Sequence, residues 1–278
     1  MINLSESATK PLLMGVLNVT PDSFSDGGLH YNASAAVSRV HKMVELGADM
    51  IDIGGESTRP GAERVPVNDQ LGRVIPVIKQ LHQELPARVP ISIDTTSTVV
   101  AGAALEQGAA IVNDISAGRD DPGMFRLVAE AGVPYIIMHM QGTPRTMQDN
   151  PRYTDVVAEI KSFLLERAAL AQHAGVMGDN LVIDPGIGFG KSKRDNLDII
   201  MNLDSFTESG YKVLLGASRK RFMGSICEIS SYSELVGATC ATTAIGVFAG
   251  VNILRVHDIK ENRQALDVAW ALARRQRN

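Results

Sequence analysis

The stretch GADMIDIGG, residues 47–55, decides the fold, because it joins a helix-ending glycine to a short apolar run. Apolar residues recur at helical spacing on one face over residues 37–44, just before Gly47. Glycine after a helix adopts the left-handed conformation without steric cost and turns the chain toward the next element. The run 50–53 then has the length and composition of a buried strand. We predict a helix, a tight turn and a strand here.

The same pattern recurs along the chain. Its further copies have glycines at Gly108, Gly132, Gly175, Gly210 and Gly250, followed by apolar runs at 111–112, 135–138, 181–183, 213–215 and 253–254. Residues 12–17 and 91–93 add two more apolar runs, which brings the predicted strands to eight. The runs are continuous rather than alternating, as expected of parallel strands that are covered on both faces.

Helices are predicted between all these strands, and residues 261–273 supply an eighth helix after the last one. Asp121-Pro122 predicts the start of one of them, because proline is favoured in a first helical turn. Eight strand–helix units fit a chain of 278 residues well. We therefore predict a (β/α)8 TIM barrel that forms a single domain over residues 1–278. An open, doubly wound sheet is the alternative.

The composition is that of an ordinary globular protein, with 45% hydrophobic and 21% charged residues. A net charge of −4 gives no basic surface for nucleic acid. Two cysteines, Cys227 and Cys240, form neither a disulfide framework nor a zinc motif. The first ten residues lack the basic and apolar pattern of a secretion signal. We expect a cytoplasmic protein.

One segment, residues 235–254, has no formal charge and is long enough to cross a membrane. Glycines, threonines and an asparagine interrupt it, and Glu234 and Arg255 flank it directly. We expect a buried helix that turns at Gly250 into a buried strand, with a membrane span as the alternative.

Polar residues follow every predicted strand. In chain order they are Asn18, Glu56, Asp94, Asn113, His139, Asp184, Lys220 and the pair Arg255 and His257. In a TIM barrel the carboxyl ends of the strands meet at one face, which carries the active site. The last two strands contribute cations, which suit an anion, whereas carboxylates and an amide follow strands three, four and six. Carboxylates pair well with planar groups that offer two donors. Polar residues that merely end strands are the alternative.

Three loops at this face are rich in glycine and polar residues. Residues 186–192 resemble a nucleotide-binding loop, but Pro185 and Lys191 stand where the two common glycine motifs require glycine. We expect instead a loop that lets backbone approach a ligand. The loops 18–28 and 54–61 are candidates for lids, with ordinary surface loops as the alternative.

Seven strings closely resemble bacterial members of the dihydropteroate synthase family. They are LNVTPDSFSDGG (17–28), GGESTRPG (54–61), SIDT (92–95), NDI (113–115), DPGIGFGK (184–191), SRK (218–220) and RVHDI (255–259). The resemblance runs from about Met14 to the C-terminal helix, and its first two strings together are highly specific. It implies an enzyme that joins 6-hydroxymethyl-7,8-dihydropterin pyrophosphate to p-aminobenzoate by an SN1-like displacement, with release of pyrophosphate.

The resemblance also implies roles for individual residues. The pterin ring would contact Asp94, Asn113, Ile115, Met138, Asp184, Phe189, Gly216 and Lys220. Pyrophosphate would contact Asn18, Arg255 and His257, with Mg2+ near Asn18. The p-aminobenzoate site would use Phe24, Thr58, Arg59, Pro60, Ser218 and Lys220. The residues expected to act in catalysis are Asp26, Arg59, Asp94, Lys220, Arg255 and His257. A homodimer and inhibition by sulfonamides, which mimic p-aminobenzoate, are implied as well.

His139 and Glu56 belong to the ring of strand-end residues but receive no chemical role. Two other functions stay open at this point. A methyltransferase of the same fold would keep the pterin site but would not need the pyrophosphate site. A non-catalytic pterin- or phosphate-binding protein would not need lid loops.

Overall fold

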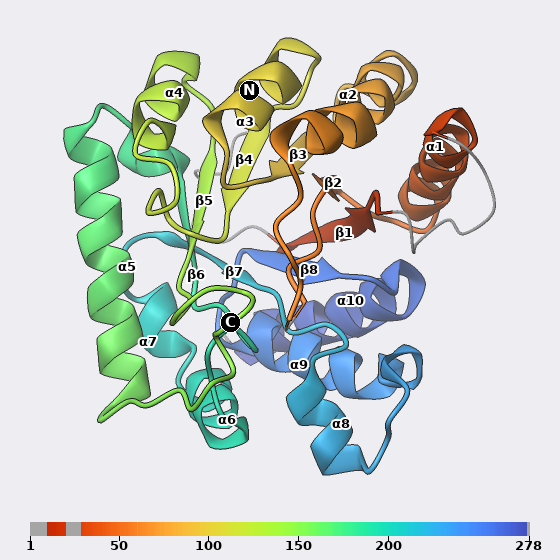
Figure 1. The fold of residues 1–278 in the computed structure, drawn as a ribbon. Coiled ribbons are helices and arrows are strands. Elements are labelled where there is room, and N and C mark those ends of the chain that lie inside the picture. The colour runs from red at the N-terminus through yellow and green to blue at the C-terminus, as the bar shows by residue number, and fades with distance from the viewer. Residues whose placement is uncertain (1–9, 21–28, 60, 277–278) are drawn as a thin grey trace.

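The computed structural model describes residues 10–20, 29–59 and 61–276 of the chain. Eight parallel strands form a closed barrel in which each strand pairs with its sequence neighbours and β1 pairs with β8 (Figure 1). The strands are β1 Leu12–Asn18, β2 Met50–Gly54, β3 Ile91–Asp94, β4 Ile111–Asp114, β5 Tyr135–Met138, β6 Leu181–Asp184, β7 Lys212–Leu215 and β8 Ile253–Val256. The predicted TIM barrel is confirmed, and the open sheet was the wrong alternative.

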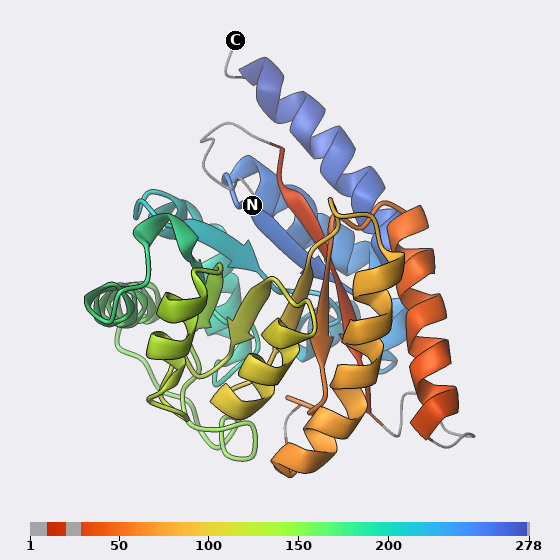
Figure 2. The same cartoon turned by 90° about the horizontal axis from the view of Figure 1, so that it is seen from above.

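Helices surround the barrel (Figures 1 and 2). They are α1 Leu29–Glu45, α2 Val67–Glu84, α3 Thr98–Glu106, α4 Met124–Ala131, α5 Val156–His173, α6 Lys193–Met201, α7 Asp204–Thr207, α8 Arg221–Cys227, α9 Val236–Phe248 and α10 Ile259–Gln276. The last two connections between strands each hold two helices, α6 with α7 and α8 with α9, where the sequence predicted one. The short helices α7 and α8 are too brief to show a clear period in sequence.

The glycine turns form as predicted. All six of these glycines have positive φ, from 65° at Gly132 to 107° at Gly108. The predicted helix start at Asp121-Pro122 is wrong, because α4 begins at Met124 after Gly123. The Asp121 carboxylate is shared: its Oδ2 accepts the backbone N–H of Thr98 at 2.9 Å, at the start of α3, and its Oδ1 accepts the backbone N–H of Gly123 at 3.1 Å. Pro122 and Gly123 thus form a turn before α4, and the Asp121 carboxylate joins this turn to the start of α3.

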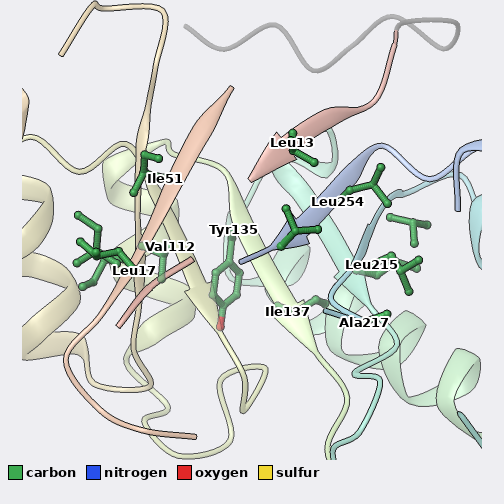
Figure 3. Packing of buried hydrophobic residues seen from close by; sticks show 14 of the residues in the cluster. Leu13, Leu17, Ile51, Val112, Tyr135, Ile137, Leu215, Ala217 and Leu254 are labelled. Carbon is green, nitrogen blue, oxygen red and sulfur yellow. The ribbon is translucent and has the colours of Figure 1, made fainter. Parts of the chain in front are cut away.

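Two hydrophobic layers lie on opposite sides of the strands. The outer layer packs between strands and helices, as Figure 3 shows for residues such as Ile51, Val112 and Leu254. The inner layer fills the barrel with Met14, Met50, Ile111, Ile136, Val182, Leu214 and Ile253. Because successive side chains of a strand point to opposite faces, the residue two places after each inner residue also points inward.

This alternation decides what the barrel mouth contains. Two places after the inner residues of β2, β4, β6 and β8 stand Asp52, Asn113, Asp184 and Arg255. On β3 the outer residues are Ile91 and Ile93, so Ser92 and Asp94 point inward. Met138 of β5 and Gly216, just after β7, also lie on the inner face, because they stand two places after the inner residues Ile136 and Leu214.

The uncharged segment 235–254 forms α9 and the first half of β8, with Gly250 in the turn between them. Over the residues that the structure describes, no helix is long and apolar enough to cross a membrane. The expectation of a helix that turns at Gly250 into a buried strand is confirmed, but α9 is buried on one face only, because Ile245 and Phe248 are exposed.

Candidate active site

Arg255 lies at the centre of the barrel mouth between two carboxylates. Its Nε donates to Asp52 Oδ2 at 2.7 Å, and its Nη2 donates to Asp94 Oδ2 at 2.9 Å. Asn113 Nδ2 donates to the same Asp52 oxygen at 2.9 Å. Burial and the nearby charge of Asp52 raise the pKa of Asp94 to about 7, although Arg255 opposes the shift. The four strands β2, β3, β4 and β8 thus meet in one hydrogen-bonded group.

Asp184 and Lys220 extend this site on the side of β6 and β7. Asp184 is buried, and its Oδ1 accepts the backbone N–H of Gly186 at 2.7 Å. Burial raises the pKa of Asp184. The Lys220 ammonium lies 4.0 Å from the centre of the Phe189 ring. Burial and repulsion by Arg255 lower the pKa of Lys220 to about 8, so it is a cation at neutral pH that can lose its proton above it.

A small apolar cluster lies beside these polar groups. It consists of Ile115, Met138, Met140, Met147 and Phe189, and it is separate from the two main hydrophobic layers. Three of its members are the predicted slot residues. Met140 and Met147 were not predicted, although Met140 continues the alternation of β5 past the end of the strand. The cluster gives a planar ring an apolar face to lie on.

The anion side contains Arg255, His257 and Asn18. Ser218 Oγ accepts the backbone N–H of His257 at 3.2 Å and lies 3.0 Å from its Nδ1. The hydroxyl proton can therefore go to Nδ1, which leaves Nε2 as a donor. Burial and the cations Arg255 and Arg219 lower the pKa of His257 to about 3. The imidazole is thus a neutral donor, whereas the sequence analysis counted it among the cations.

The predicted p-aminobenzoate residues are brought together only in part. Thr58 lines a pocket of about 330 Å³ with Thr96 and Ile115, and neither Ser218 nor Lys220 is among its lining residues. Arg59 is exposed. Phe24, Asp26 and Pro60 lie outside the described residues.

Hydrogen bonds explain Glu56 and His139, the two strand-end residues for which no chemical role was predicted. Glu56 Oε1 accepts the backbone N–H of Val65 at 2.8 Å and so closes the base of the 54–65 loop. His139 is buried, and its Nδ1 lies 3.1 Å from Lys191 Nζ. Burial and the Lys191 charge hold the pKa of His139 far below its usual value. Both residues support loops.

The same lysine explains the glycine-rich loop. Lys191 is buried, and its Nζ also donates to the backbone carbonyl of Phe189 at 2.9 Å. Gly186 has φ 70°, and a Cβ there would lie 2.0 Å from the carbonyl oxygen of His139. The glycines therefore allow the loop to pack against the end of β5 and hold Phe189 in place. Lys191 points into protein, away from the position that a phosphate-binding lysine would need.

Asp52 is the principal site residue that the sequence analysis missed. It stands inside the apolar run of β2 and not after it, so a search of strand ends passes over it. The usable signal was a single carboxylate within an otherwise apolar strand.

The chain resembles known proteins over almost its whole length. The model of the family described as pterin binding enzyme matches residues 14–257. The dihydropteroate synthase of Synechocystis is 43% identical over 94% of this chain and 90% of its own length. The mitochondrial folate synthesis bifunctional protein of Arabidopsis thaliana is 44% identical over 99% of this chain, which spans only 52% of that relative.

A solved structure agrees with these relatives. Dihydropteroate synthase of Xanthomonas albilineans, determined with 4-aminobenzoic acid, superposes with a TM-score of 0.89 at 44% identity. The match covers 95% of this chain and 93% of that one. The fold, the inward-facing residues of the barrel mouth and these matches agree: the chain belongs to the pterin-binding enzyme family and, within it, to the dihydropteroate synthases.

Proposed function

We propose that this chain condenses 6-hydroxymethyl-7,8-dihydropterin pyrophosphate with p-aminobenzoate to give 7,8-dihydropteroate and pyrophosphate. The observation that carries the proposal is the sorting of charge across the barrel mouth. Asp94, Asn113 and Asp184 offer acceptors on the ring side; donors on the pyrophosphate side come from His257 and from Arg255, which lies at the centre of the mouth bound to Asp94. A substrate with a donor-rich ring and a pyrophosphate tail matches both sides at once.

The pterin ring lies, in this proposal, on the cluster of Ile115, Met138 and Phe189, over Gly216. Asp184 has one oxygen committed to Gly186, so its Oδ2 is left for the amino edge of the ring. Because Asn113 points its amide nitrogen at Asp52, its oxygen is free to accept from the ring as well. The Lys220 ammonium, held over Phe189, donates to an acceptor of the ring.

The pyrophosphate contacts Asn18, Arg255 and His257. His257, as a neutral donor through Nε2, hydrogen-bonds a phosphate oxygen without adding charge. A Cβ added at Gly54 would lie 3.7 Å from Asn18 Oδ1, so this amide oxygen lies close to the polar group. Mg2+ prefers oxygen ligands and often shares few protein groups with substrate phosphates, a mode that Asn18 fits. When bound, Mg2+ would neutralise phosphate charge.

The chemistry follows from these placements. Departure of pyrophosphate leaves a cation that is delocalised over the ring, so an SN1-like path is open. Arg255 and His257 stabilise the departing charge, and an ionised Asp94 stabilises the cation. The aromatic amine then attacks the exocyclic carbon. The new C–N bond leaves an extra proton on nitrogen, which passes to water or to the released pyrophosphate. Because an aromatic amine is a weak base, this proton leaves readily, and the position of the amine matters more than its deprotonation.

The second substrate enters, in this proposal, from the side of the 54–61 loop. Thr58 and Arg59, with Ser218 and the Lys220 stem, receive p-aminobenzoate. Phe24, Asp26 and Pro60 complete the site on the sequence resemblance alone. Sulfonamides, which mimic p-aminobenzoate, compete for the same position.

We also propose a homodimer. Large apolar side chains are exposed on α9 and α10, including Phe248 (43%) and Val268 (62%). These helices lie side by side on the outside of the barrel, so their apolar residues can form one surface (Figure 1). Since exposed apolar surface of this kind often marks protein interfaces, a second copy of the chain is the proposed occupant.

The free cysteines Cys227 and Cys240 accord with a reducing cytoplasm, which is the proposed location of the protein.

The test is direct. Purified protein with Mg2+ and both substrates is expected to release pyrophosphate in step with formation of 7,8-dihydropteroate. An Asp184→Ala variant purified in parallel measures any contaminating enzyme from the expression host. Folded protein that forms no product above that background contradicts the proposal. Methyl transfer from a methylated folate, or pterin binding without turnover, would instead support one of the two alternative functions.

A further inference from the structure

Asp52 is a buried carboxylate that the proposed chemistry does not use. It lies within β2, and no part of it is exposed. Its Oδ2 accepts from Arg255 Nε at 2.7 Å and from Asn113 Nδ2 at 2.9 Å. Both partners are proposed to touch the substrate, one at the pyrophosphate and one at the ring. A single oxygen therefore connects the two halves of the site.

The two contacts restrict their partners in different ways. An ionised carboxylate only accepts hydrogen bonds, so it fixes which end of the Asn113 amide faces it. The amide oxygen of Asn113 is then directed away from Asp52, where a donor-rich ring can use it. The guanidinium of Arg255 is bound through Nε to Asp52 and through Nη2 to Asp94, so its plane is set by two carboxylates and its Nη1 is left for an anion.

Stability does not explain this carboxylate. Its Oδ1 is buried without a hydrogen-bond partner, and so is the hydroxyl of Ser92, the residue opposite it on β3. Burying polar atoms without partners costs free energy, and apolar residues in place of buried ion pairs are often neutral or stabilising. A fold under selection for stability alone would place an apolar side chain at this position.

We propose that Asp52 is a positioning residue that holds Arg255 and the Asn113 amide in the orientation that binds the pterin pyrophosphate. This inference rests on the proposed function and deepens it. It predicts that Asp52 acts on the pterin substrate and not on p-aminobenzoate, because its two partners face the pterin substrate only.

The test compares Asp52→Asn with Ser92→Ala. Asparagine keeps the volume of Asp52 and removes its charge, whereas Ser92→Ala removes a neighbouring buried hydroxyl that has no partner. Hydrogen bonds to charged groups account for roughly ten- to hundredfold in binding. We therefore expect kcat/KM for the pterin substrate to fall at least about tenfold in Asp52→Asn, with KM for p-aminobenzoate within about twofold of wild type. Ser92→Ala is expected to match wild type in both.

A pH profile separates positioning from a general loss of packing. The charges of Asp52, Arg255, Asp114, Glu56 and Lys220 act on Asp94, and after burial the Asp52 charge is the largest cause of its raised pKa, about 7. Without the Asp52 charge the pKa of Asp94 falls. The acid limb of kcat/KM, which reports groups of the free enzyme, should therefore move to lower pH in Asp52→Asn and stay in place in Ser92→Ala.

The outcomes are distinct. If wild type itself shows no pterin-dependent turnover, the proposed function fails first. If wild type is active and Asp52→Asn keeps its pterin kcat/KM and its acid limb, the positioning role is wrong. Equal losses in Asp52→Asn and Ser92→Ala would also overturn it, because they would indicate packing. Asp52→Ser serves as the second variant if the asparagine variant does not fold, with the same expected loss. Failure of both to fold would make Asp52 a stability residue and overturn the proposal.

Discussion

Replacement of Asp184 by asparagine tests pterin recognition with the smallest possible change of shape. Asp184 Oδ1 accepts from the backbone N–H of Gly186 at 2.7 Å, and Oδ2 is the oxygen left for a ligand. In Asp184→Asn one of these two positions must hold an NH2 group. If the NH2 faces the ligand, it meets the donor edge of the ring. If it faces Gly186, the side-chain NH2 and the backbone N–H of Gly186 are two donors that oppose each other.

Either orientation loses one charge-assisted hydrogen bond and leaves a buried donor unpaired. Such a bond contributes about 1.5–3 kcal/mol. An unpaired buried donor costs a further amount that is about equal to the lower end of this range. We expect a loss near 3 kcal/mol, or roughly a hundredfold in the dissociation constant of the pterin substrate. Folding should not suffer. Burial raises the pKa of Asp184 and so opposes its charge in the folded state, which means that a neutral side chain removes a cost.

The assay is calorimetric titration with the pterin pyrophosphate, alongside thermal unfolding of the same preparation. Asp198→Asn is the matched control, because Asp198 is a half-exposed acid on the neighbouring helix α6. It should bind the pterin substrate as wild type does. Asp184→Asn that binds within threefold of wild type, while folded, would refute the role of this carboxylate.

Three further outcomes are expected. Lys220 has a pKa of about 8, so its ammonium is present below that pH and lost above it, and activity should fall on the alkaline side near pH 8. Arginine stays charged, so in Lys220→Arg this alkaline limb should disappear from the pH profile of kcat/KM, whatever the residual rate. In Gly216→Ala the added methyl would lie 3.7 Å from Asp184 Oδ2, an ordinary contact, so thermal stability should not change. Because the methyl occupies space where the pterin ring is proposed to lie, pterin affinity should drop about tenfold in the calorimetric titration. Phe248→Glu on α9 should shift sedimentation toward the monomer, whereas Met177→Glu, at an exposed position on a different part of the surface, should leave it unchanged.

Much of the fold could be predicted because its signals are local. A glycine that must adopt positive φ, and a short apolar run after it, mark each unit without reference to the rest of the chain. The strand-end residues Asp94, Asn113 and Asp184 could be found for the same reason. Prediction failed where one local signal fits two structures: Asp121 Oδ1 accepts the Gly123 N–H as a helix cap would, yet Pro122 and Gly123 form a turn and α4 begins only at Met124.

Closure of the barrel decided the rest of the site. The alternation of each strand is written in the sequence, and it already determines that Asp52 and Arg255 lie on the same face as the inner apolar residues of their own strands. Their contact is a different matter, because 203 residues separate them and only the pairing of β1 with β8 and β2 brings the two side chains together. Burial in that closed space then changes chemistry that composition cannot reveal: it makes His257 a neutral donor and raises the pKa of Asp94 to about 7. The sequence by itself determined the units and the residue types at the barrel mouth, whereas distances, orientation and protonation follow from tertiary packing, since electrostatic effects depend on separation and solvent exclusion.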